Sequence, residues 1–336
     1  MSYEPKSDEG QHNSEPRYRA LLATGELAAR AQRAVAALER CLLCPRRCGT
    51  NRVAGDRGFC RTARRALVAS AVPHRGEEPC ISAHRGSGTI FFTHCNLACA
   101  FCQNCDISQQ GRGEEAPASE LAGLMLALAG RGCHNINLVT PSHVGPQILE
   151  ALVAAAEAGL AVPLVWNSGG YDGLETLALF DGVVDIYMPD MKYGSNEHGA
   201  RLSKASDYTD RAKEALAEMH RQVGDLVIDE DGVARRGLLV RHLVLPDDLA
   251  GTRGVLTFLA GLSTGIGLSL MSQYRPCFRA LDDPALCRSV RPDEYYRAVA
   301  WVEELGFEQA WVQHLASRDD WVPDFGEDDP FRSSRG

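Results

Sequence analysis

From residue 86 onward, short apolar stretches alternate with longer segments in which apolar residues recur every three or four positions. The short stretches predict buried strands at 89–93, 135–139, 164–167, 184–188, 238–244 and 267–271. The longer segments predict helices at 118–129, 146–158, 174–180, 207–223, 251–262 and 295–305. Six strand–helix units indicate an α/β protein with a parallel sheet, which right-handed crossovers would curl into a full or partial barrel. A doubly wound open sheet fits the same periodicity.

The segments outside this region divide the rest of the chain. Residues 1–40 are expected to hold a disordered start, up to about Pro16, and one packing helix at 17–40 with Thr24 as a plausible N-cap. Residues 41–85 form a small cysteine-rich module, 86–315 the barrel and 316–336 an acidic surface tail. A hairpin centred on Asp231 and Gly232 is expected at 226–236, before the fifth strand.

The 12 cysteines are many for a protein in a reducing compartment unless metal or redox chemistry uses them. One group, in the stretch from Gly88 to Ser108, directly follows the first strand. Cys95, Cys99 and Cys102 have C-x3-C-x2-C spacing with Phe101 before the last cysteine. Three thiolates can hold a [4Fe-4S] cluster and leave one iron open to an outside ligand.

A second group of four cysteines lies nearer the N-terminus, in a C-x2-C-x3-C-x11-C pattern. This pattern has the ligand count of a closed zinc or iron-sulfur site, and several arginines around it could offset the thiolate charge. A loop of reduced cysteines and a second cluster that passes electrons remain the alternatives. The ligands of this possible second metal site are Cys41, Cys44, Cys48 and Cys60.

Polar side chains follow every predicted strand, and the carboxyl ends of parallel barrel strands meet at one mouth. These groups suit a ligand that has a carboxylate, an amino group, hydroxyls and an apolar ring system. Lone histidines such as His242 are as readily explained by ordinary hydrogen bonding. The candidates at the second to fifth strand ends are Ser142, His143, Asn167, Asp190, Lys192 and Arg241.

The C-x3-C-x-aromatic-C loop after a strand resembles the signature of the radical S-adenosylmethionine (SAM) superfamily, and its F-C-Q-N continuation resembles the branch related to pyruvate formate-lyase activating enzyme. The resemblance implies a partial (β/α)6 TIM-like barrel, a [4Fe-4S] cluster and SAM. It further implies reductive cleavage of SAM to methionine and a 5'-deoxyadenosyl radical that abstracts hydrogen, possibly to activate a glycyl-radical protein, with flavodoxin or ferredoxin as reductant.

Individual residues take roles from the same resemblance. Asp190 and Lys192 match the D-x-K of glycyl-radical activating enzymes, which helps to hold SAM, with Lys192 near its carboxylate. Arg241 is the first residue of a segment that matches the R-x-x-V-x-P motif of the same enzymes. Phe101 would lie near the adenine of SAM. The G-G-E that often follows the second strand is absent. Ser142 and His143 stand at that position and are candidates for contact with the SAM amino group.

The main alternative concerns Cys105, three residues after Cys102. With it the motif reads C-x3-C-x2-C-x2-C, which could close a four-cysteine zinc or electron-transfer site without SAM chemistry. In the family that the loop resembles, this position is commonly aromatic, which favours Cys105 as a neighbour rather than a ligand. The alternative is a metal-bearing binding or redox module.

The overall charge and hydrophobicity limit the partners. A formal net charge of -9 disfavours a general nucleic-acid or membrane-surface binder, which needs a basic field. The polar, acidic start is unlike a signal peptide, and no apolar run is long enough to span a bilayer. We therefore expect a cytoplasmic protein without nucleic-acid or membrane partners, acting on a protein, peptide or small molecule.

Overall fold

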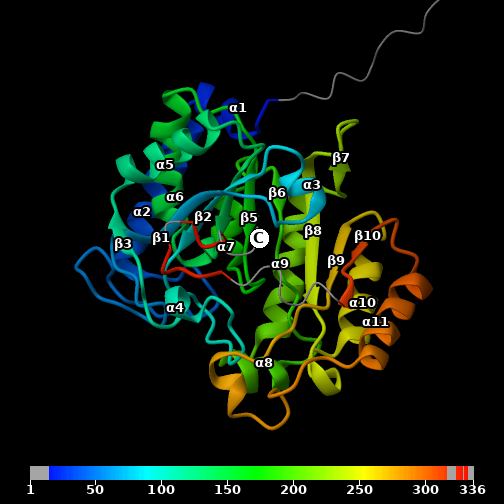
Figure 1. The fold of residues 1–336 in the computed structure, drawn as a ribbon. Helices are drawn as coiled ribbons and strands as arrows, with labels where there is room; N and C mark the ends of the chain where they lie inside the picture. The colour runs from blue at the N-terminus through cyan, green and yellow to red at the C-terminus, as the bar shows by residue number, and fades with distance from the viewer. Residues whose placement is uncertain (1–14, 316–322, 328, 332–336) are drawn as a thin grey trace, which may run out of the picture.

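The predicted parallel strands form one curved sheet in the computed structural model, which describes residues 15–315, 323–327 and 329–331 (Figure 1). Its parallel strands run in the order of the chain, each hydrogen-bonded to the next. They are β2 (Ser87–Phe92), β4 (Ile136–Val139), β5 (Leu164–Asn167), β6 (Ile186–Tyr187), β8 (Ala234–Leu243), β9 (Gly267–Met271) and β10 (Gln309–Val312).

This strand order separates the two expected architectures. A doubly wound sheet reverses its order at a switch point, whereas every parallel strand here lies beside the next one along the chain. The described residues contain no pairing between β2 and β10, so the sheet is a partial barrel with an open seam. The predicted fold class is confirmed.

The sequence analysis did not predict three strands at the edges of this sheet. β1 (Ala66–His74) is antiparallel to β2, β3 (Glu114–Ala116) is antiparallel to β1, and β10 adds a seventh parallel strand beyond β9. β10 alternates half-buried and exposed residues, and β1 is mostly half-buried. Such edge strands lack the continuous apolar run by which the central strands are recognised. β1 also joins the segment 41–85 to the main sheet.

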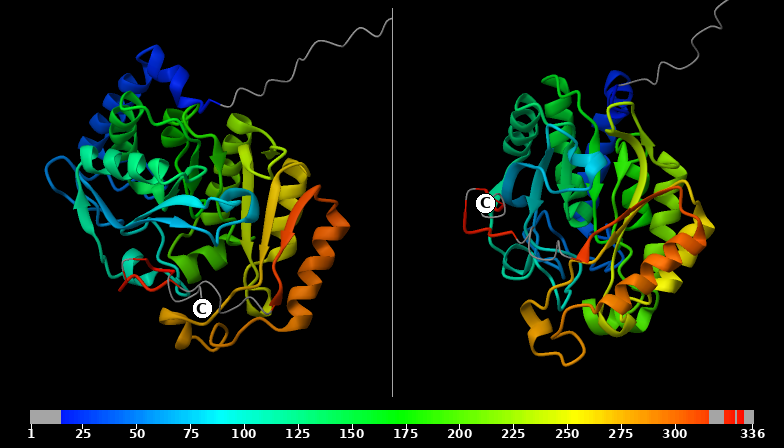
Figure 2. Two further views of the ribbon diagram at one scale, coloured as in Figure 1. Left: turned by 45° about the horizontal axis from the view of Figure 1, so that its top comes forward. Right: turned by 45° about the vertical axis from the view of Figure 1, so that its right-hand side comes forward.

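Helices cover the outer face of the sheet (Figures 1 and 2). They pack on the strand residues that point outward, such as Leu138, Trp166 and Val240, in the largest apolar cluster. The covering helices are α2 (Glu26–Ala36), α5 (Ala118–Gly130), α6 (Gly145–Glu157), α7 (Leu174–Leu179), α8 (Asn196–Ser203), α9 (Tyr208–Val223), α10 (Thr252–Leu262) and α11 (Pro292–Leu305).

The inner face of the sheet changes from apolar to polar along the strands, because alternate residues point inward. A short helix, α3 (Pro79–Ser82), packs Ile81 against Val165, Ile186 and Leu239 on this face. Further toward the carboxyl ends the inward residues include Asn167, Arg241 and Ser269, which line a cavity. The fold therefore fills one end of the barrel with apolar side chains and leaves polar groups at the other.

The single helix expected at 17–40 was wrong in its detail. The chain forms α1 (Tyr18–Ala23) and then α2, with a break at Thr24 and Gly25. Gly25 has φ 77°, a conformation that favours glycine, and the Thr24 hydroxyl donates to the carbonyls of Ala20 and Leu21 instead of capping α2. Thr24 is therefore the end of one helix and not the start of the next.

The remaining predictions outside the barrel have mixed outcomes. The hairpin is confirmed, since β7 (Val227–Ile228) is antiparallel to the start of β8. Of the segment 316–336, Phe325 and Phe331 are buried against Phe91 on β2, with ring centroids 5.3 and 5.9 Å away. The disordered start predicted for the N-terminus lies almost wholly outside the described residues.

Candidate functional site

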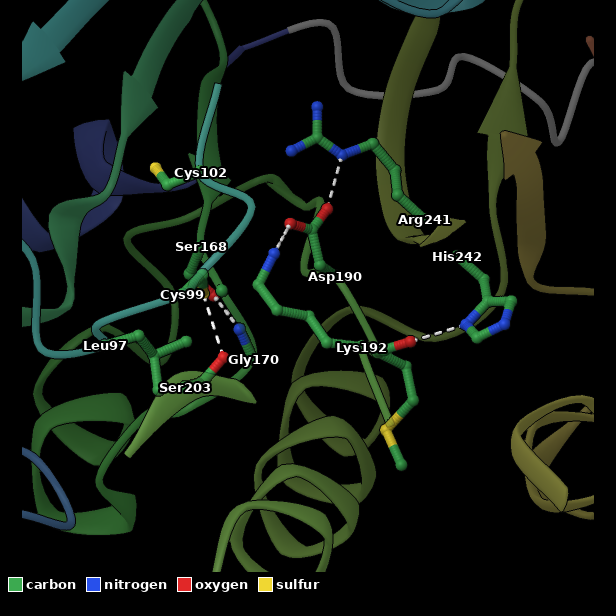
Figure 3. A network of polar contacts seen from close by, with 12 residues as sticks. Leu97, Cys99, Cys102, Ser168, Gly170, Asp190, Lys192, Ser203, Arg241 and His242 are labelled. Atoms are coloured by element: carbon green, nitrogen blue, oxygen red, sulfur yellow. Dashed lines mark hydrogen bonds and ion pairs between the residues drawn. The ribbon is translucent and has the colours of Figure 1, made fainter. Parts of the chain in front are cut away.

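The thiol loop after β2 is held in place by α8. The backbone N–H groups of Ala98 and Ala100 donate to the carbonyls of Ser203 and Leu202, at 3.1 and 2.8 Å. The Ser203 hydroxyl also donates to the Cys99 sulfur, at 3.0 Å (Figure 3). Because α8 follows the fourth parallel strand, the loop leaving β2 is positioned by a distant part of the chain.

The three predicted ligand thiols lie within electrostatic range of one another. Burial raises the pKa of Cys95 and raises that of Cys102 to about 12, and in both cases a neighbouring Cys99 thiolate would raise it further. The positive charge of Lys192 acts in the opposite direction on both thiols. Metal ligation requires thiolates, so a bound cation would have to supply the remaining stabilisation.

Cys99 and Cys102 open into a cavity at the carboxyl ends of the strands, which we call the thiol cavity. Phe101 and three charged side chains, Asp190, Lys192 and Arg241, also line it. Cys95 does not line this cavity; it lines a separate one with Leu97 and Ser108, although it lies within electrostatic range of Cys99, Cys102 and Lys192. The loop from β2 and residues from β6 and β8 thus meet at one mouth, as expected for a parallel barrel.

The three charged residues form a continuous ion-pair network (Figure 3). The Lys192 ammonium is 2.5 Å from Asp190 Oδ2, and Arg241 Nε is 2.9 Å from Asp190 Oδ1. Burial alone would raise the pKa of Asp190, but Arg241 and Lys192 hold it below its ordinary value. Asp190 is therefore ionised at neutral pH and orients both cations.

Two further predicted residues adjoin this network. Arg241 Nη2 donates to Asn167 Oδ1 at 2.7 Å, which places Asn167 on the inner face beside the guanidinium. Phe101 is buried and makes edge contacts with Tyr193 and Tyr274, at 6.4 and 5.8 Å between ring centroids. An apolar aromatic wall and a set of charged groups thus face the same cavity.

Two predicted residues lie elsewhere. His143 is buried, lines a different cavity beside the N-terminal cysteines and contacts the Thr93 carbonyl through Nε2 at 3.0 Å. Burial lowers its pKa to about 3, so the ring is neutral at pH 7. Ser142 is buried and is not among the residues that line the thiol cavity. The polar loop that follows β4, the second parallel strand, therefore lies away from Cys99 and Cys102.

His242 also points away from the thiol cavity, on the helix side of β8. Its Nδ1 donates to the Met191 carbonyl at 2.6 Å (Figure 3), and its Nε2 accepts from the Thr252 hydroxyl at 3.0 Å. Both ring nitrogens are satisfied in a fully buried position. This placement agrees with the interpretation of His242 as an ordinary hydrogen-bonded histidine.

Cys105 is separated from the three thiols that precede it. It begins a short helix, α4 (Cys105–Ser108), and does not line the thiol cavity. Burial and the Asp106 carboxylate raise the pKa of Cys105. A Cys105 thiolate would raise the pKa of Cys277, which burial already raises to about 11. Cys95 does not line the thiol cavity either, but the charges of Cys99 and Cys102 raise its pKa, whereas Asp106 is the charged side chain that raises the pKa of Cys105, so the structure groups Cys95 and not Cys105 with Cys99 and Cys102.

The four N-terminal cysteines do gather at one place. Cys41, Cys44, Cys48 and Cys60 line a single small cavity together with Arg46, Arg47 and Arg52. Burial raises the pKa of Cys44 to about 12, and the other three thiolates would raise it further. A Cβ at Gly58 would lie 2.7 Å from the Cys48 sulfur, so a glycine is needed there.

Neither thiol set is already arranged around a single ion. Within the described residues, no three His, Cys, Asp or Glu side chains meet the geometry of one bound metal ion. A cubane cluster attaches each cysteine to a different iron atom and so requires wider spacing than a mononuclear site. The donor set around the thiol cavity, three thiols with a nearby ammonium, fits such a cluster in kind and number.

Two residues that matter for the site gave no signal in the sequence. The Tyr208 hydroxyl lies 2.9 and 3.0 Å from the carbonyls of Gly169 and Asp190 and accepts the backbone N–H of Lys192 at 2.8 Å. It thereby fixes the backbone that carries the D-x-K pair. Glu77 is 3.4 Å from Arg241 Nη1 although it precedes the barrel by sequence. Only the chain fold brings both residues to this mouth.

The fold and site together define a partial-barrel α/β protein with a three-thiol loop at the carboxyl ends of its parallel strands. Its sequence is 32% identical over 278 residues to Uncharacterized protein MJ0674 of Methanocaldococcus jannaschii, a match that spans 80% of this chain and 76% of the archaeal protein. The chain therefore belongs to the family of that archaeal protein. No protein-family model matches the sequence.

Solved structures with a similar course of the chain include a radical SAM methyltransferase from Sphaerobacter thermophilus, at 17% identity and a TM-score of 0.46, over 67% of this chain and 65% of that one. Another is Streptococcus suis SuiB bound to the precursor peptide SuiA, at 11% identity and a TM-score of 0.47, over 67% of this chain and 48% of that one. The chain spans less than two thirds of both structures, and these likenesses are too distant to assign an activity.

No helix in the described part of the chain combines the length and apolar character that a bilayer crossing requires.

Proposed function

We propose that the protein is a radical SAM enzyme that holds a [4Fe-4S] cluster through Cys95, Cys99 and Cys102. The observation that carries the proposal is the grouping of charges: Cys99 and Cys102 share a cavity with Lys192, and Cys95, which lies outside that cavity, is within electrostatic range of all three. Three thiols leave one iron without a protein ligand, and the cavity beside it contains groups suited to SAM. The sequence resemblance supports the same assignment.

The bound cluster would supply the electron that cleaves SAM to methionine and a 5'-deoxyadenosyl radical. The protein's own groups bind and orient. Lys192 offers an ammonium for a carboxylate, Asp190 holds Lys192 and Arg241 in place, and Phe101 gives an apolar face for adenine. Asn167 fixes the direction of the Arg241 guanidinium.

Anaerobic reconstitution with iron and sulfide, followed by dithionite and SAM, tests this function. The protein should form 5'-deoxyadenosine and methionine in equal amounts, and SAM should change the EPR spectrum of the reduced cluster. A fully reconstituted protein that yields no 5'-deoxyadenosine and whose EPR spectrum ignores SAM would contradict the proposal.

A narrower form of the proposal is activation of a glycyl-radical protein, with flavodoxin or ferredoxin as the electron donor. It is supported by the D-x-K pair Asp190 and Lys192 and by the motif that begins at Arg241, which resemble those of activating enzymes. An anaerobic pull-down, combined with transfer of deuterium from labelled glycine into 5'-deoxyadenosine, distinguishes this substrate from a small molecule.

We also propose that Cys41, Cys44, Cys48 and Cys60 bind a second metal centre, because all four line one cavity with three arginines. The centre would lie near the thiol loop: Arg46 from the same segment donates to the Asn96 carbonyl at 2.9 Å, next to Cys95. Four thiols make a closed ligand set for zinc or an iron-sulfur cluster.

Metal analysis checks the second centre directly. Cys44→Ser is expected to remove about one zinc, or about four irons, per chain while the thiol-loop cluster remains, as expected for one four-cysteine site. Cys287→Ser is the control, since that cysteine is exposed and far from both sets in the sequence. Equal metal contents for wild type and Cys44→Ser would refute this second centre.

A further inference from the structure

A second, larger cavity adjoins the thiol cavity along the open seam of the barrel, and we call it the seam cavity. Its lining includes Glu77 and Glu78 from the turn after β1, Ser269 from β9 and Gln313 just after β10. Arg241 and Gln273 are among the residues that line both cavities. The seam cavity therefore shares part of its lining with the cavity that holds Cys99 and Lys192.

The turn between β1 and α3 places two adjacent carboxylates inside the barrel. The Glu78 carbonyl accepts the backbone N–H groups of Ile81 and Ser82, at 2.8 and 3.1 Å, and so starts α3. α3 is itself fixed by the apolar contacts of Ile81 with the inner face of the sheet. The positions of both carboxylates thus follow from a packed element, not from a free loop.

The two carboxylates differ in their partners. Glu77 Oε1 accepts from Asn137 Nδ2 at 2.9 Å, and Glu77 Oε2 is 3.4 Å from Arg241 Nη1. Glu78 Oε2 is buried and has no hydrogen-bond partner within the part of the chain that the structure describes, and the residue as a whole is only 9% exposed. A buried carboxylate oxygen with no donor is costly, so Oε2 of Glu78 is left unsatisfied although Ser269 and the charge of Arg241 act on the same carboxyl group.

The charges around the two cavities do not balance. Three carboxylates, Glu77, Glu78 and Asp190, face two enclosed cations, Lys192 and Arg241. With all three carboxyl groups ionised, one negative charge would be in excess; because burial raises the pKa of Glu77 and Glu78, either a proton or an added cation relieves this excess. Arg75 also lines the seam cavity, but it is exposed at the rim, where it donates to the His84 carbonyl at 3.1 Å.

Arg241 cannot neutralise Glu78 fully, because it already serves Asp190, Glu77 and Asn167. Burial raises the pKa of Glu78, the charge of Arg241 lowers it and the charge of Glu77 raises it again. Burial likewise raises the pKa of Glu77. The site therefore gains free energy from any added positive charge that also donates hydrogen bonds.

We propose that the seam cavity binds the substrate through a positively charged nitrogen group, an amine or a guanidinium, with Glu78 as its counter-ion and Glu77 beside it. The identity of this ligand as the substrate rests on the proposed function. The binding of a cationic group does not, since it follows from the two carboxylates alone.

The test compares molecules of one shape and different charge on the full-length protein. n-Butylguanidinium and n-butylurea have nearly the same shape, but only the first is charged and has the additional N–H donor. Calorimetric titration is expected to give at least about tenfold tighter binding for n-butylguanidinium, the size of one hydrogen bond to a charged group. Equal affinity for the two molecules would overturn the inference, and this comparison needs no variant.

Two variants assign the preference to Glu78. Glu78→Gln keeps the size of the side chain and is expected to abolish the preference, whereas Glu157→Gln, on the exposed side of α6, is expected to keep it. Circular dichroism verifies that each variant folds. If a folded Glu78→Gln protein still preferred n-butylguanidinium as strongly as wild type does, Glu78 would not be the counter-ion.

A capped glycine-arginine-glycine peptide separates two sources of the cationic group. Affinity at least equal to that of n-butylguanidinium indicates a side chain of a peptide or protein, and affinity at least about tenfold weaker indicates a free small molecule. Both results support a cation site. SAM cleavage is measured separately. A protein that cleaves SAM but binds n-butylguanidinium and n-butylurea equally refutes this inference alone. A protein that prefers n-butylguanidinium but does not cleave SAM refutes only the proposed function.

Discussion

Replacing Cys99 by alanine is expected to remove the [4Fe-4S] cluster and to lower 5'-deoxyadenosine formation by more than about 100-fold. Loss of a group that only hydrogen-bonds a metal ligand lowers activity by up to about 100-fold, and loss of the ligand itself should lower it more. Cys99 lines the thiol cavity and is held by the Ser203 hydroxyl at 3.0 Å. Loss of this thiol leaves the cluster with too few protein ligands. Iron content, the EPR spectrum and product analysis of the anaerobically reconstituted variant measure the effect.

Cys105→Ala is the matched control, because this thiol lies in the same loop but outside the thiol cavity. Its cluster and its 5'-deoxyadenosine formation are expected to remain within about twofold of wild type, since Cys105 does not line the cavity that Cys99 and Cys102 share. If Cys105→Ala lost the cluster as Cys99→Ala does, both thiols would be ligands and the site would be a closed four-cysteine module.

Replacing Arg241 by alanine is expected to lower the free energy of unfolding by about 3–5 kcal/mol, the usual cost of breaking a buried ion pair. The guanidinium is largely enclosed, with 18% of its side chain exposed, and it lies 2.9 Å from Asp190 and 3.4 Å from Glu77. Its removal leaves two carboxylates without their main cation. Urea unfolding at pH 7 measures the loss.

Arg235→Ala on the same strand provides the comparison. Its ion pair with Asp229 is partly exposed, so the variant is expected to lose less than about 1 kcal/mol. Asp190→Asn combined with Arg241→Ala is expected to recover part of the stability, because one uncompensated charge is then absent. A loss for Arg241→Ala no larger than that for Arg235→Ala would show that the network contributes little.

The Arg241→Ala deficit should also depend on pH. In wild type the pKa of Asp190 is held below its ordinary value, so the stability it contributes is present at neutral pH and is lost only in strong acid. Without Arg241, burial would raise the pKa of Asp190 and raise that of Glu77 further, and stability would then increase as pH falls through those values. The deficit should therefore shrink as the pH is lowered from 7.

The sequence determined the parts of this protein that depend on local patterns. Apolar runs identified the central strands such as β4 and β5, since strands covered on both faces are continuously apolar. The short-range spacing of Cys95, Cys99 and Cys102 identified the thiol loop, and D-x-K identified Asp190 and Lys192. Each of these signals lies within a few residues, where the chain geometry is fixed by the elements themselves.

Only the tertiary structure decided which of these residues meet. Periodicity could not distinguish a partial barrel from a doubly wound sheet, because that choice depends on which strands pair. It could not place His143 away from the thiol cavity or bring Glu77, from before the barrel, to Arg241. The number of thiols around the cavity is likewise a spatial question: Cys105 is close to Cys102 along the chain, but α4 turns it away. Contacts between distant segments depend on how the whole sheet curves and packs, and no local pattern encodes them.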